Sequence, residues 1–277
     1  MVITGAGGQV GRALRALLPD AKGFTHSEMD LTDRAALMRE VVAFRPEVIF
    51  NAAAYTRVDD AEREPEAAMT VNRDGVANIA AVVAHVGALL VHLSTDYVFS
   101  GTKPGPYDEE DEPDPVSAYG KSKLAGESEA QGAGRHLIVR TSWVFGEGRN
   151  FVRAILGAAS SRDEVRVVDD QRGLPSYAPD LAEGLISLVQ AGAEGVYHLA
   201  GGGPPATWAE VAEHAIECAG LRTSVRRVST SDYYAGQVGP VATRPPNSVL
   251  DCSKAAGLGV ELRPWTQAVA EYVKEIA

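Results

Sequence analysis

Apolar runs that alternate with helix-patterned segments constrain the fold of this chain more than any other feature. Residues 2–4 (VIT), 46–54 (PEVIFNAAA) and 88–95 (ALLVHLST) are the apolar runs, and residues 9–18 and 64–86 between them carry apolar residues at helical spacing. Strands without apolar–polar alternation are typical of a parallel sheet that helices cover on both faces. The pattern therefore predicts an α/β fold with a doubly wound parallel sheet.

The second half of the chain is less regular. It combines short strands at 164–168 and 195–200, helices at 179–192 and 207–220, and a proline-rich stretch at 239–248. We expect a first domain at residues 1–145, completed by segments that return from the second half. Residues 146–277 are expected to form mainly a smaller α/β substrate-binding part at the carboxyl edge of the sheet.

The glycine turn after the first strand indicates a dinucleotide site. TGAGGQVG (residues 4–11) has glycines at positions 5, 8 and 11, and a further one at position 7. In a Rossmann-type domain these glycines make a tight turn, let a pyrophosphate approach the backbone and let the helix pack closely on the strand. A purely structural turn is the alternative, but the strand–turn–helix context favours a dinucleotide.

A short second strand is expected near residues 23–25, and the residues at its end concern the choice of cofactor. Thr25, His26 and Ser27 stand where an acidic residue usually holds the adenosine ribose. Because a carboxylate would repel a 2′-phosphate, its absence permits NADPH without excluding NADH. Asp30, which is followed by Leu31, could bond the adenine amine or cap the next helix.

Tyr119 and Lys123 stand four positions apart in VSAYGKSKLAGE, which has helical character. Residues at this spacing share one helical face, so both can point at the same ligand. A nearby ammonium favours the phenolate, and a phenol tuned in this way is a usable general acid for a carbonyl under reduction. A surface Tyr–Lys pair is the alternative. Ser94 or Thr95, at the end of a buried strand, could donate a hydroxyl to the same carbonyl oxygen.

Composition and charge exclude several classes of function. Asp and Glu number 37 and Lys and Arg number 26, which opposes a nucleic-acid-binding surface. Cys218 and Cys252 lie far apart without metal-ligand spacing, which fits a reducing compartment such as the cytoplasm. No apolar run approaches the roughly 18 residues of a membrane span, and the opening MVITGAGG leaves no room for a signal peptide.

Taken together, these motifs resemble those of the extended short-chain dehydrogenase/reductases, and most closely the dTDP-4-dehydrorhamnose reductase family. The resemblance runs over nearly the whole chain. It rests on the stretches GAGGQVG, RPEVIFNAAAYTRVDDAE, LSTDYVFSGTKPGPYDEEDEPDPVSAYGKSKLAGE, IVRTSWVFG, DDQRGLPS and RPPNSVLD.

The resemblance implies an NAD(P)H-dependent reduction of the C4 ketone of dTDP-4-dehydrorhamnose to dTDP-L-rhamnose, with NADPH as the expected cofactor and NADH possible. Thr95, Tyr119 and Lys123 then form the catalytic triad. Tyr119 protonates the new alkoxide, Thr95 hydrogen-bonds it and Lys123 lowers the pKa of the phenol.

The resemblance also assigns binding residues. Those expected around the cofactor are Gly5, Gly8, Gln9, Val10, Asp30, Leu31, Ala52, Ala53, Ala54, Tyr55 and Thr56, with Tyr119 and Lys123. Those expected around the sugar nucleotide are Thr95, Asp96, Trp143, Asn150 and Arg244. Packing is the alternative for Trp143. Salt bridging and helix capping are the alternatives for Arg244 and Asn150, which are candidates for the diphosphate.

The chain departs from the family pattern at one position, and three other functions remain open. Some family members bind Mg²⁺ at a dimer interface through a glutamate where this chain has Ala13, so we expect no metal and a monomer or weak homodimer. The same scaffold reduces other nucleotide-linked 4-keto-6-deoxy sugars. It also resembles the non-catalytic, NADP-binding β-subunit of methionine adenosyltransferase, and a redox sensor with a degraded pocket is the third rival. Retention of Thr95, Tyr119 and Lys123 favours the reductase.

Overall fold

A six-stranded sheet forms the centre of the structure, a computed structural model that describes residues 1–276. Its strands are β1 (Val2–Thr4), β2 (Lys22–Phe24), β3 (Val48–Asn51), β4 (Leu89–Thr95), β5 (His136–Thr141) and β10 (Gly195–His198). They lie in the order β10-β5-β4-β3-β1-β2, and every neighbouring pair is parallel. The expected doubly wound parallel sheet is confirmed. The order reverses between β1 and β3, the switch point at which such sheets bind ligands.

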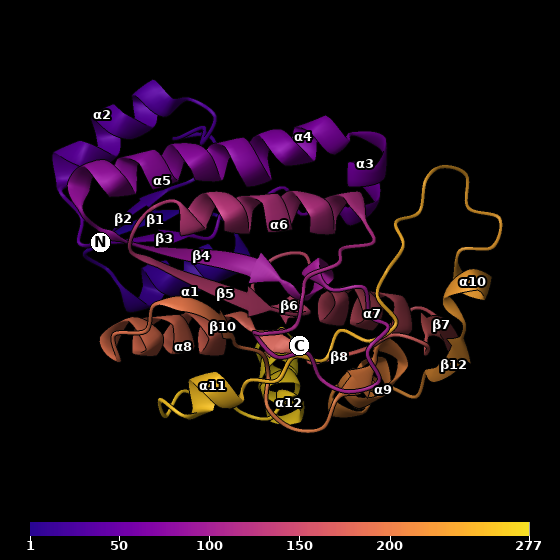
Figure 1. Ribbon diagram of the computed structural model, residues 1–277. Helices are drawn as coiled ribbons and strands as arrows, with labels where there is room; N and C mark the ends of the chain where they lie inside the picture. The colour runs from indigo at the N-terminus through magenta and orange to yellow at the C-terminus, as the bar shows by residue number, and fades with distance from the viewer. Residues whose placement is uncertain (277) are drawn as a thin grey trace.

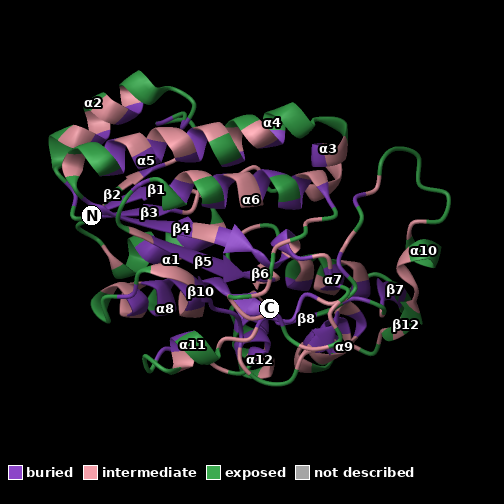
Figure 2. Cartoon of the chain, viewed as in Figure 1, coloured by how far each residue is buried: buried purple, intermediate pink, exposed green. Residues whose placement is uncertain are grey.

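Helices cover both faces of this sheet (Figure 1). Helices α1 (Gln9–Leu17) and α8 (Ala178–Gln190) pack on the face that presents Ile3, Phe50 and Val91. Helices α2 (Arg34–Phe44) and α5 (Gly75–Val86) cover the face that presents Val2, Ile49 and Leu90, and α6 (Ala118–Gln131) lies beside α5. Because both faces are covered, the inner strands β1, β3, β4 and β5 are buried along almost their whole length, as Figure 2 shows.

The segment expected as one long helix at residues 64–86 is interrupted. Helix α4 (Pro65–Met69) continues into a π-helical turn, η1 (Thr70–Asp74), before α5 begins. Single π-turns within helices are frequent at functional sites. Asp33 caps the start of α2, since its carboxylate accepts a hydrogen bond from the Ala36 N–H at 2.9 Å.

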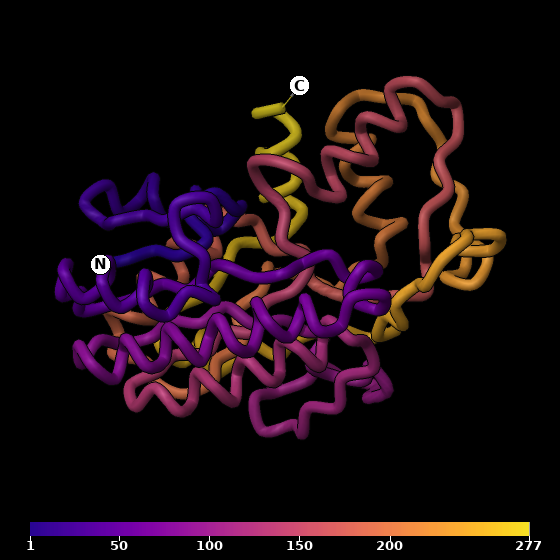
Figure 3. The backbone as a smooth tube through the Cα atoms, turned by 90° about the horizontal axis from the view of Figure 1, so that it is seen from above, coloured from indigo at the N-terminus to yellow at the C-terminus, as the bar shows by residue number. Residues whose placement is uncertain are grey.

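A smaller α/β part lies beside the end of the sheet to which β4 and β5 point, as Figures 1 and 3 show. Its elements are α7 (Phe151–Ala159), β7 (Glu164–Val168), α9 (Trp208–Cys218), β12 (Ser224–Val228) and α12 (Trp265–Ile276). They share one apolar core, and β12 pairs parallel with β7. The sequence did not predict β12 or α12. Of the helices described, none is long and apolar enough to cross a membrane.

The remaining elements are short. They are α3 (Val58–Arg63), η2 (Asp96–Val98), β6 (Val144–Phe145), β8 (Arg172–Gly173), β9 (Ser176–Tyr177), β11 (Ala206–Thr207), α10 (Thr230–Tyr233) and α11 (Ser253–Ala256). Strand β10 and helix α8 return from the second half of the chain to the central sheet. The domain boundary at residue 145 stays a prediction.

Candidate active site

The glycine turn brings the start of α1 against the loop after β3. Gly5 has a φ of +69°, and a Cβ there would lie 2.5 Å from the Ala52 carbonyl carbon. A Cβ on Gly11 would lie 2.1 Å from the Gly5 carbonyl oxygen. Both positions therefore require glycine. Gly8 precedes α1 without a side-chain cap and the first turn has no acidic residue, so the N–H groups at this helix end are available to an anion.

A cavity of about 430 Å³ opens beside this turn. Its lining consists of Gly5, Gly7, Gly8, His26, Met29, Asp30, Leu31, Thr32, Ala52, Ala53, Ala54, Tyr55, Thr56, Arg57 and Val71. Most of the residues expected around a cofactor are thus brought together here. Gln9, Val10, Tyr119 and Lys123 are not in this lining, and Val10 is instead buried in the core under α1.

The lining of this cavity includes the acidic Asp30, the basic Arg57 and His26. Asp30 accepts from the Thr32 N–H and hydroxyl at 2.9 and 2.8 Å, and these bonds keep the pKa of its carboxyl below the ordinary value. Asp30 therefore bonds the loop before α2, but Asp33 is the helix cap. Neither His26 nor Arg57 was predicted as a site residue. His26 stands at the position where an acid usually holds the adenosine ribose, which marks it as a candidate, whereas no local signal identifies Arg57.

Tyr119 and Lys123, the expected catalytic pair, lie in the first turns of α6. The Ser117 side chain accepts from the Gly120 N–H at 3.1 Å and so caps the helix one residue before it begins. Lys123 is buried, and its ammonium donates to the Leu93 carbonyl of β4 at 2.7 Å. Burial lowers the pKa of Lys123 to about 8, although Glu127 raises it.

The expected lowering of the Tyr119 pKa by Lys123 is not what the structure shows. Burial and then the Asp96 carboxylate raise the pKa of Tyr119, and only the nearby Thr95 hydroxyl lowers it. The Lys123 ammonium is directed to the Leu93 carbonyl rather than to the phenol. Tyr119 is therefore a fully protonated phenol at neutral pH in this geometry.

Thr95 and Asp96, at the end of β4, lie close to this phenol. The Thr95 hydroxyl donates to Asp96 Oδ1 at 2.9 Å and accepts from the Tyr97 N–H at 3.2 Å. Burial raises the pKa of Asp96 to about 6, which its hydrogen bonds only partly offset. A buried carboxylate with a raised pKa at the carboxyl end of a central strand is typical of a functional site.

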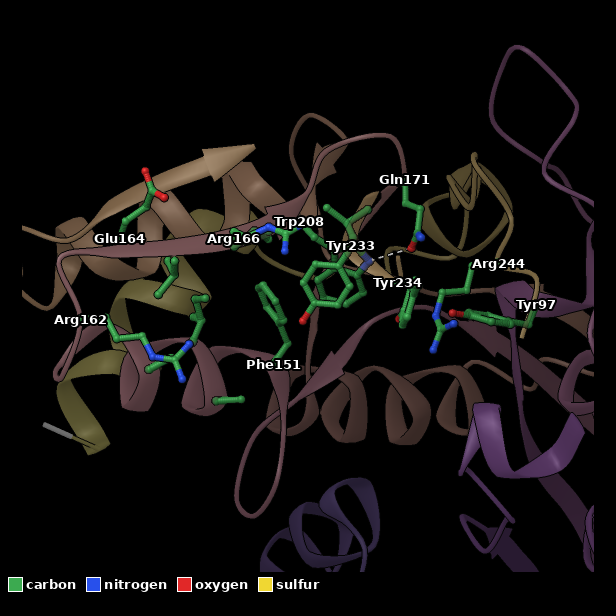
Figure 4. Close-up of a pocket in the computed structure, with 16 residues that line it drawn as sticks. Tyr97, Phe151, Arg162, Glu164, Arg166, Gln171, Trp208, Tyr233, Tyr234 and Arg244 are labelled. Carbon is green, nitrogen blue, oxygen red and sulfur yellow. Dashed lines mark hydrogen bonds between the residues drawn. The ribbon is translucent and has the colours of Figure 1, made fainter. Parts of the chain in front are cut away.

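A larger cavity of about 600 Å³ lies in the smaller part (Figure 4). Its lining is rich in aromatic and arginine side chains, including Tyr97, Phe151, Trp208, Tyr234 and Arg244. Aromatic faces with cationic groups suit a ligand that combines a base and phosphates.

Trp143, expected to contact the sugar, packs against Trp208 in the wall of the larger cavity but does not line the cavity. Its ring stacks on that of Trp208 at a centroid distance of 3.6 Å and an interplanar angle of 8°. Its φ of +49° is unusual for a non-glycine residue. A Cβ on Gly173 would lie 2.5 Å from its indole, so glycine is required at that position. Trp208, which the sequence analysis did not propose, lines the cavity itself.

The two diphosphate candidates differ in their surroundings. Arg244 lies in the wall of the larger cavity, where Nη2 donates to Asp59 Oδ2 at 2.8 Å. Asn150 lies outside both linings described above. It caps α7 through Oδ1, while its amide donates to the Gly146 carbonyl and the Tyr272 hydroxyl at 2.6 and 2.7 Å. The capping alternative for Asn150 is therefore the one that the structure supports.

Several buried polar atoms near the switch point fit a polar ligand such as a dinucleotide. Within residues 1–276, Gln9 Oε1, Tyr55 Oη, Ser94 Oγ and Asp96 Oδ2 have no hydrogen-bond partner. Buried polar atoms normally have hydrogen-bond partners, so several unpartnered atoms around the switch point indicate that a ligand binds there. Across the same residues, no group of three His, Cys, Asp or Glu side chains is placed to hold a metal ion.

Comparisons with known proteins agree with this site. The family described as RmlD substrate binding domain matches residues 1–277. A dTDP-4-dehydrorhamnose reductase of Sinorhizobium fredii is 39% identical over 286 residues, which cover 99% of this chain and 96% of the relative. A dTDP-4-keto-6-deoxy-D-glucose reductase of Streptomyces niveus is 39% identical over 279 residues, covering 98% of this chain and 95% of that relative.

Among solved structures, that of a dTDP-4-dehydrorhamnose reductase from Bacillus anthracis, in complex with NADP, superposes with a TM-score of 0.93. It is 35% identical and covers 99% of this chain and 98% of that chain. With its whole length matched and its fold shared, this chain belongs to the RmlD substrate binding domain family, that of the dTDP-4-dehydrorhamnose reductases.

Proposed function

We propose that the protein reduces the C4 ketone of dTDP-4-dehydrorhamnose to dTDP-L-rhamnose, with NADPH as the reductant. One observation carries the proposal: the position of Tyr119 between the two cavities. Its ring packs in one cluster with Tyr55 and Tyr97. Tyr55 lines the smaller cavity and Tyr97 lines the larger one, so a proton donor stands where ligands of the two cavities would meet.

The smaller cavity fits NADP. The α1 amino terminus with Gly8 would hold the pyrophosphate, and the loop of Ala54, Tyr55 and Thr56 would hold the nicotinamide end. His26 lines the cavity close after β2, where an acid would oppose a 2′-phosphate, and this supports NADPH over NADH. When bound, the nicotinamide supplies the hydride, and Tyr119 delivers the proton to the sugar oxygen.

The raised pKa of Tyr119 is compatible with this acid role. An alkoxide is a far stronger base than a phenolate, since even water has a pKa of about 15.7. Proton transfer from a protonated phenol to the alkoxide is therefore downhill without any lowering of the phenol pKa. Thr95 donates to Asp96 in this structure, so a bond from Thr95 to the substrate oxygen would replace that bond.

The test is NADPH oxidation by the purified protein with dTDP-4-dehydrorhamnose, followed by identification of the product sugar. We expect stoichiometric oxidation and dTDP-L-rhamnose as the product. Turnover only with the 4-keto precursor that has the D-gluco configuration would assign the activity of the Streptomyces niveus relative instead. Tight NADPH binding without oxidation on any 4-keto nucleotide sugar would favour a non-catalytic binding subunit.

A further inference from the structure

Arg244 depends on other residues for its orientation. It lies in a segment without helix or strand, and a long arginine side chain loses rotamer entropy on being fixed. Three contacts hold it: Nη1 donates to the Ala242 carbonyl at 3.0 Å, Nη2 donates to Asp59 at 2.8 Å, and its guanidinium lies 5.1 Å from the centre of the Tyr234 ring. Figure 4 shows Arg244 between Tyr97 and Tyr234 at one end of the larger cavity.

Asp59 contributes two of the bonds that fix this segment. Its Oδ1 accepts the Ala242 N–H at 3.0 Å, while its Oδ2 accepts Arg244 Nη2. Burial by itself would raise the pKa of Asp59, but the bonds from Arg244 and Ala242 lower it overall, so the carboxylate is charged at neutral pH. A guanidinium has five N–H donors, and three remain for a ligand after the bonds to Asp59 and Ala242.

Asp59 also stands next to the cofactor cavity. It belongs to α3, which follows directly on the loop of Ala52 to Arg57 that lines the smaller cavity. Asp59 therefore joins the loop at one cavity to the arginine at the other, across 185 positions of sequence.

From this geometry we infer that Asp59 is a positioning residue: it presents Arg244 to the diphosphate of the sugar nucleotide and sets the affinity for that ligand. The inference rests on the proposed function, since it takes the ligand of the larger cavity to be a nucleoside diphosphate. A bond between oppositely charged groups that are partly buried is strong enough to fix one rotamer. The side chains of Arg244 and Asp59 are 14% and 38% exposed.

The test measures binding of dTDP and of thymidine by calorimetry, with the full-length protein saturated with NADPH. We expect Asp59→Ala to weaken dTDP binding about tenfold and to leave thymidine and NADPH binding within about twofold of the wild type. Asp60→Ala is the matched control because Asp60 is equally exposed, on the same turn, and pairs with Arg57 and Arg63 instead. It should bind dTDP like the wild type.

A double-variant comparison separates positioning from simple structural support. If Asp59 acts through Arg244, the protein with both Asp59→Ala and Arg244→Ala binds dTDP as Arg244→Ala alone does. Should Asp59→Ala fail to fold, Asp59→Asn, which has nearly the same volume, is expected to weaken dTDP binding in the same direction. Additive losses, or unchanged dTDP affinity in Asp59→Ala, would overturn the inference but not the proposed function. A wild-type protein that does not bind dTDP would overturn both.

Discussion

The side-chain amide of Asn72 bonds both the N–H and the carbonyl of Tyr55, at 2.8 and 3.1 Å. The same amide donates to the Ser122 hydroxyl at 2.8 Å, and that hydroxyl donates to the Tyr119 carbonyl at 2.7 Å. One side chain on the π-helical turn η1 thus joins the loop at the smaller cavity to the helix that carries the proposed proton donor.

We predict that Asn72→Ala lowers both stability and cofactor affinity. Asn72 is 1% exposed, and the variant leaves the part-buried N–H and carbonyl of Tyr55 without these partners, at a cost of about 1–3 kcal/mol for each group. Denaturant unfolding should show a loss of roughly 2–4 kcal/mol in the free energy of unfolding. Fluorescence titration should show a raised Kd for NADPH, because the Tyr55 loop is no longer fixed.

Ser122→Ala is the matched control for Asn72→Ala. It removes the link to α6 but keeps both bonds from Asn72 to Tyr55. It should therefore retain the wild-type Kd for NADPH. Equal NADPH affinity of Asn72→Ala and the wild type would show that this amide does not shape the cofactor cavity.

Asn72 illustrates which parts of the site the sequence could not predict. The glycine turn was predictable because the conformation at Gly5 and the close approach at Gly11 each require a glycine at a fixed offset from a strand. The shared face of Tyr119 and Lys123 was predictable from helical spacing. Asn72, by contrast, lies within an apolar helical pattern, and nothing in that pattern marks the π-helical turn that directs its amide to Tyr55.

The sequence also could not predict contacts between segments that lie far apart in the chain. The Asp59–Arg244 bond joins residues 185 positions apart, and the bond from Lys123 to the Leu93 carbonyl depends on how α6 packs on β4. Spacing alone suggested that Lys123 would act on the phenol. The structure directs its ammonium elsewhere, because a buried charge takes the nearest acceptor that can satisfy it.

We predict that Tyr119→Phe lowers kcat by about 10²–10⁴-fold, the usual contribution of a general acid. The ring keeps its edge-to-face contact with Tyr97 at a centroid distance of 5.6 Å, so the cavities keep their walls. The Kd for NADPH, measured by fluorescence titration, should stay within about twofold of the wild type. Tyr97→Phe, on the other ring of this pair, is the control and should retain far more activity. Wild-type turnover in Tyr119→Phe would assign the proton to another donor.

The pH dependence of kcat/KM should report Lys123. Its pKa of about 8 means that it is protonated below and neutral above that pH. We expect the charged form to be the active one, so that kcat/KM falls about tenfold per pH unit above pH 8. Lys121→Gln, which removes an exposed lysine on the same helix, should show the same fall of kcat/KM above pH 8. A profile that stays flat to pH 10 would contradict a role for the Lys123 charge in the free enzyme.

Asp96 is expected to lower stability at neutral pH, as functional carboxylates often do. Its pKa of about 6 in the folded protein exceeds the ordinary value of 3.8, so the folded state binds this proton more tightly than the unfolded chain does. The free energy of unfolding of the wild type therefore falls as the pH rises from about 4 to about 6, and the loss is complete above that range. Asp96→Asn removes the titration while keeping an oxygen to accept from Thr95.

Denaturant unfolding at two pH values tests this assignment. At pH 8 we expect Asp96→Asn to be more stable than the wild type by on the order of 2 kcal/mol, and at pH 4 or below the two should be equal. Asp30→Asn is the control, and its effect on stability should have the opposite sign, because bonds from Thr32 lower the pKa of Asp30. That variant should be less stable than the wild type at pH 8 and equal to it at low pH. If Asp96→Asn were no more stable than the wild type at pH 8, the Asp96 carboxylate would have to be well solvated or fully hydrogen-bonded. Its pKa would then not be raised, and it would no longer indicate a functional site.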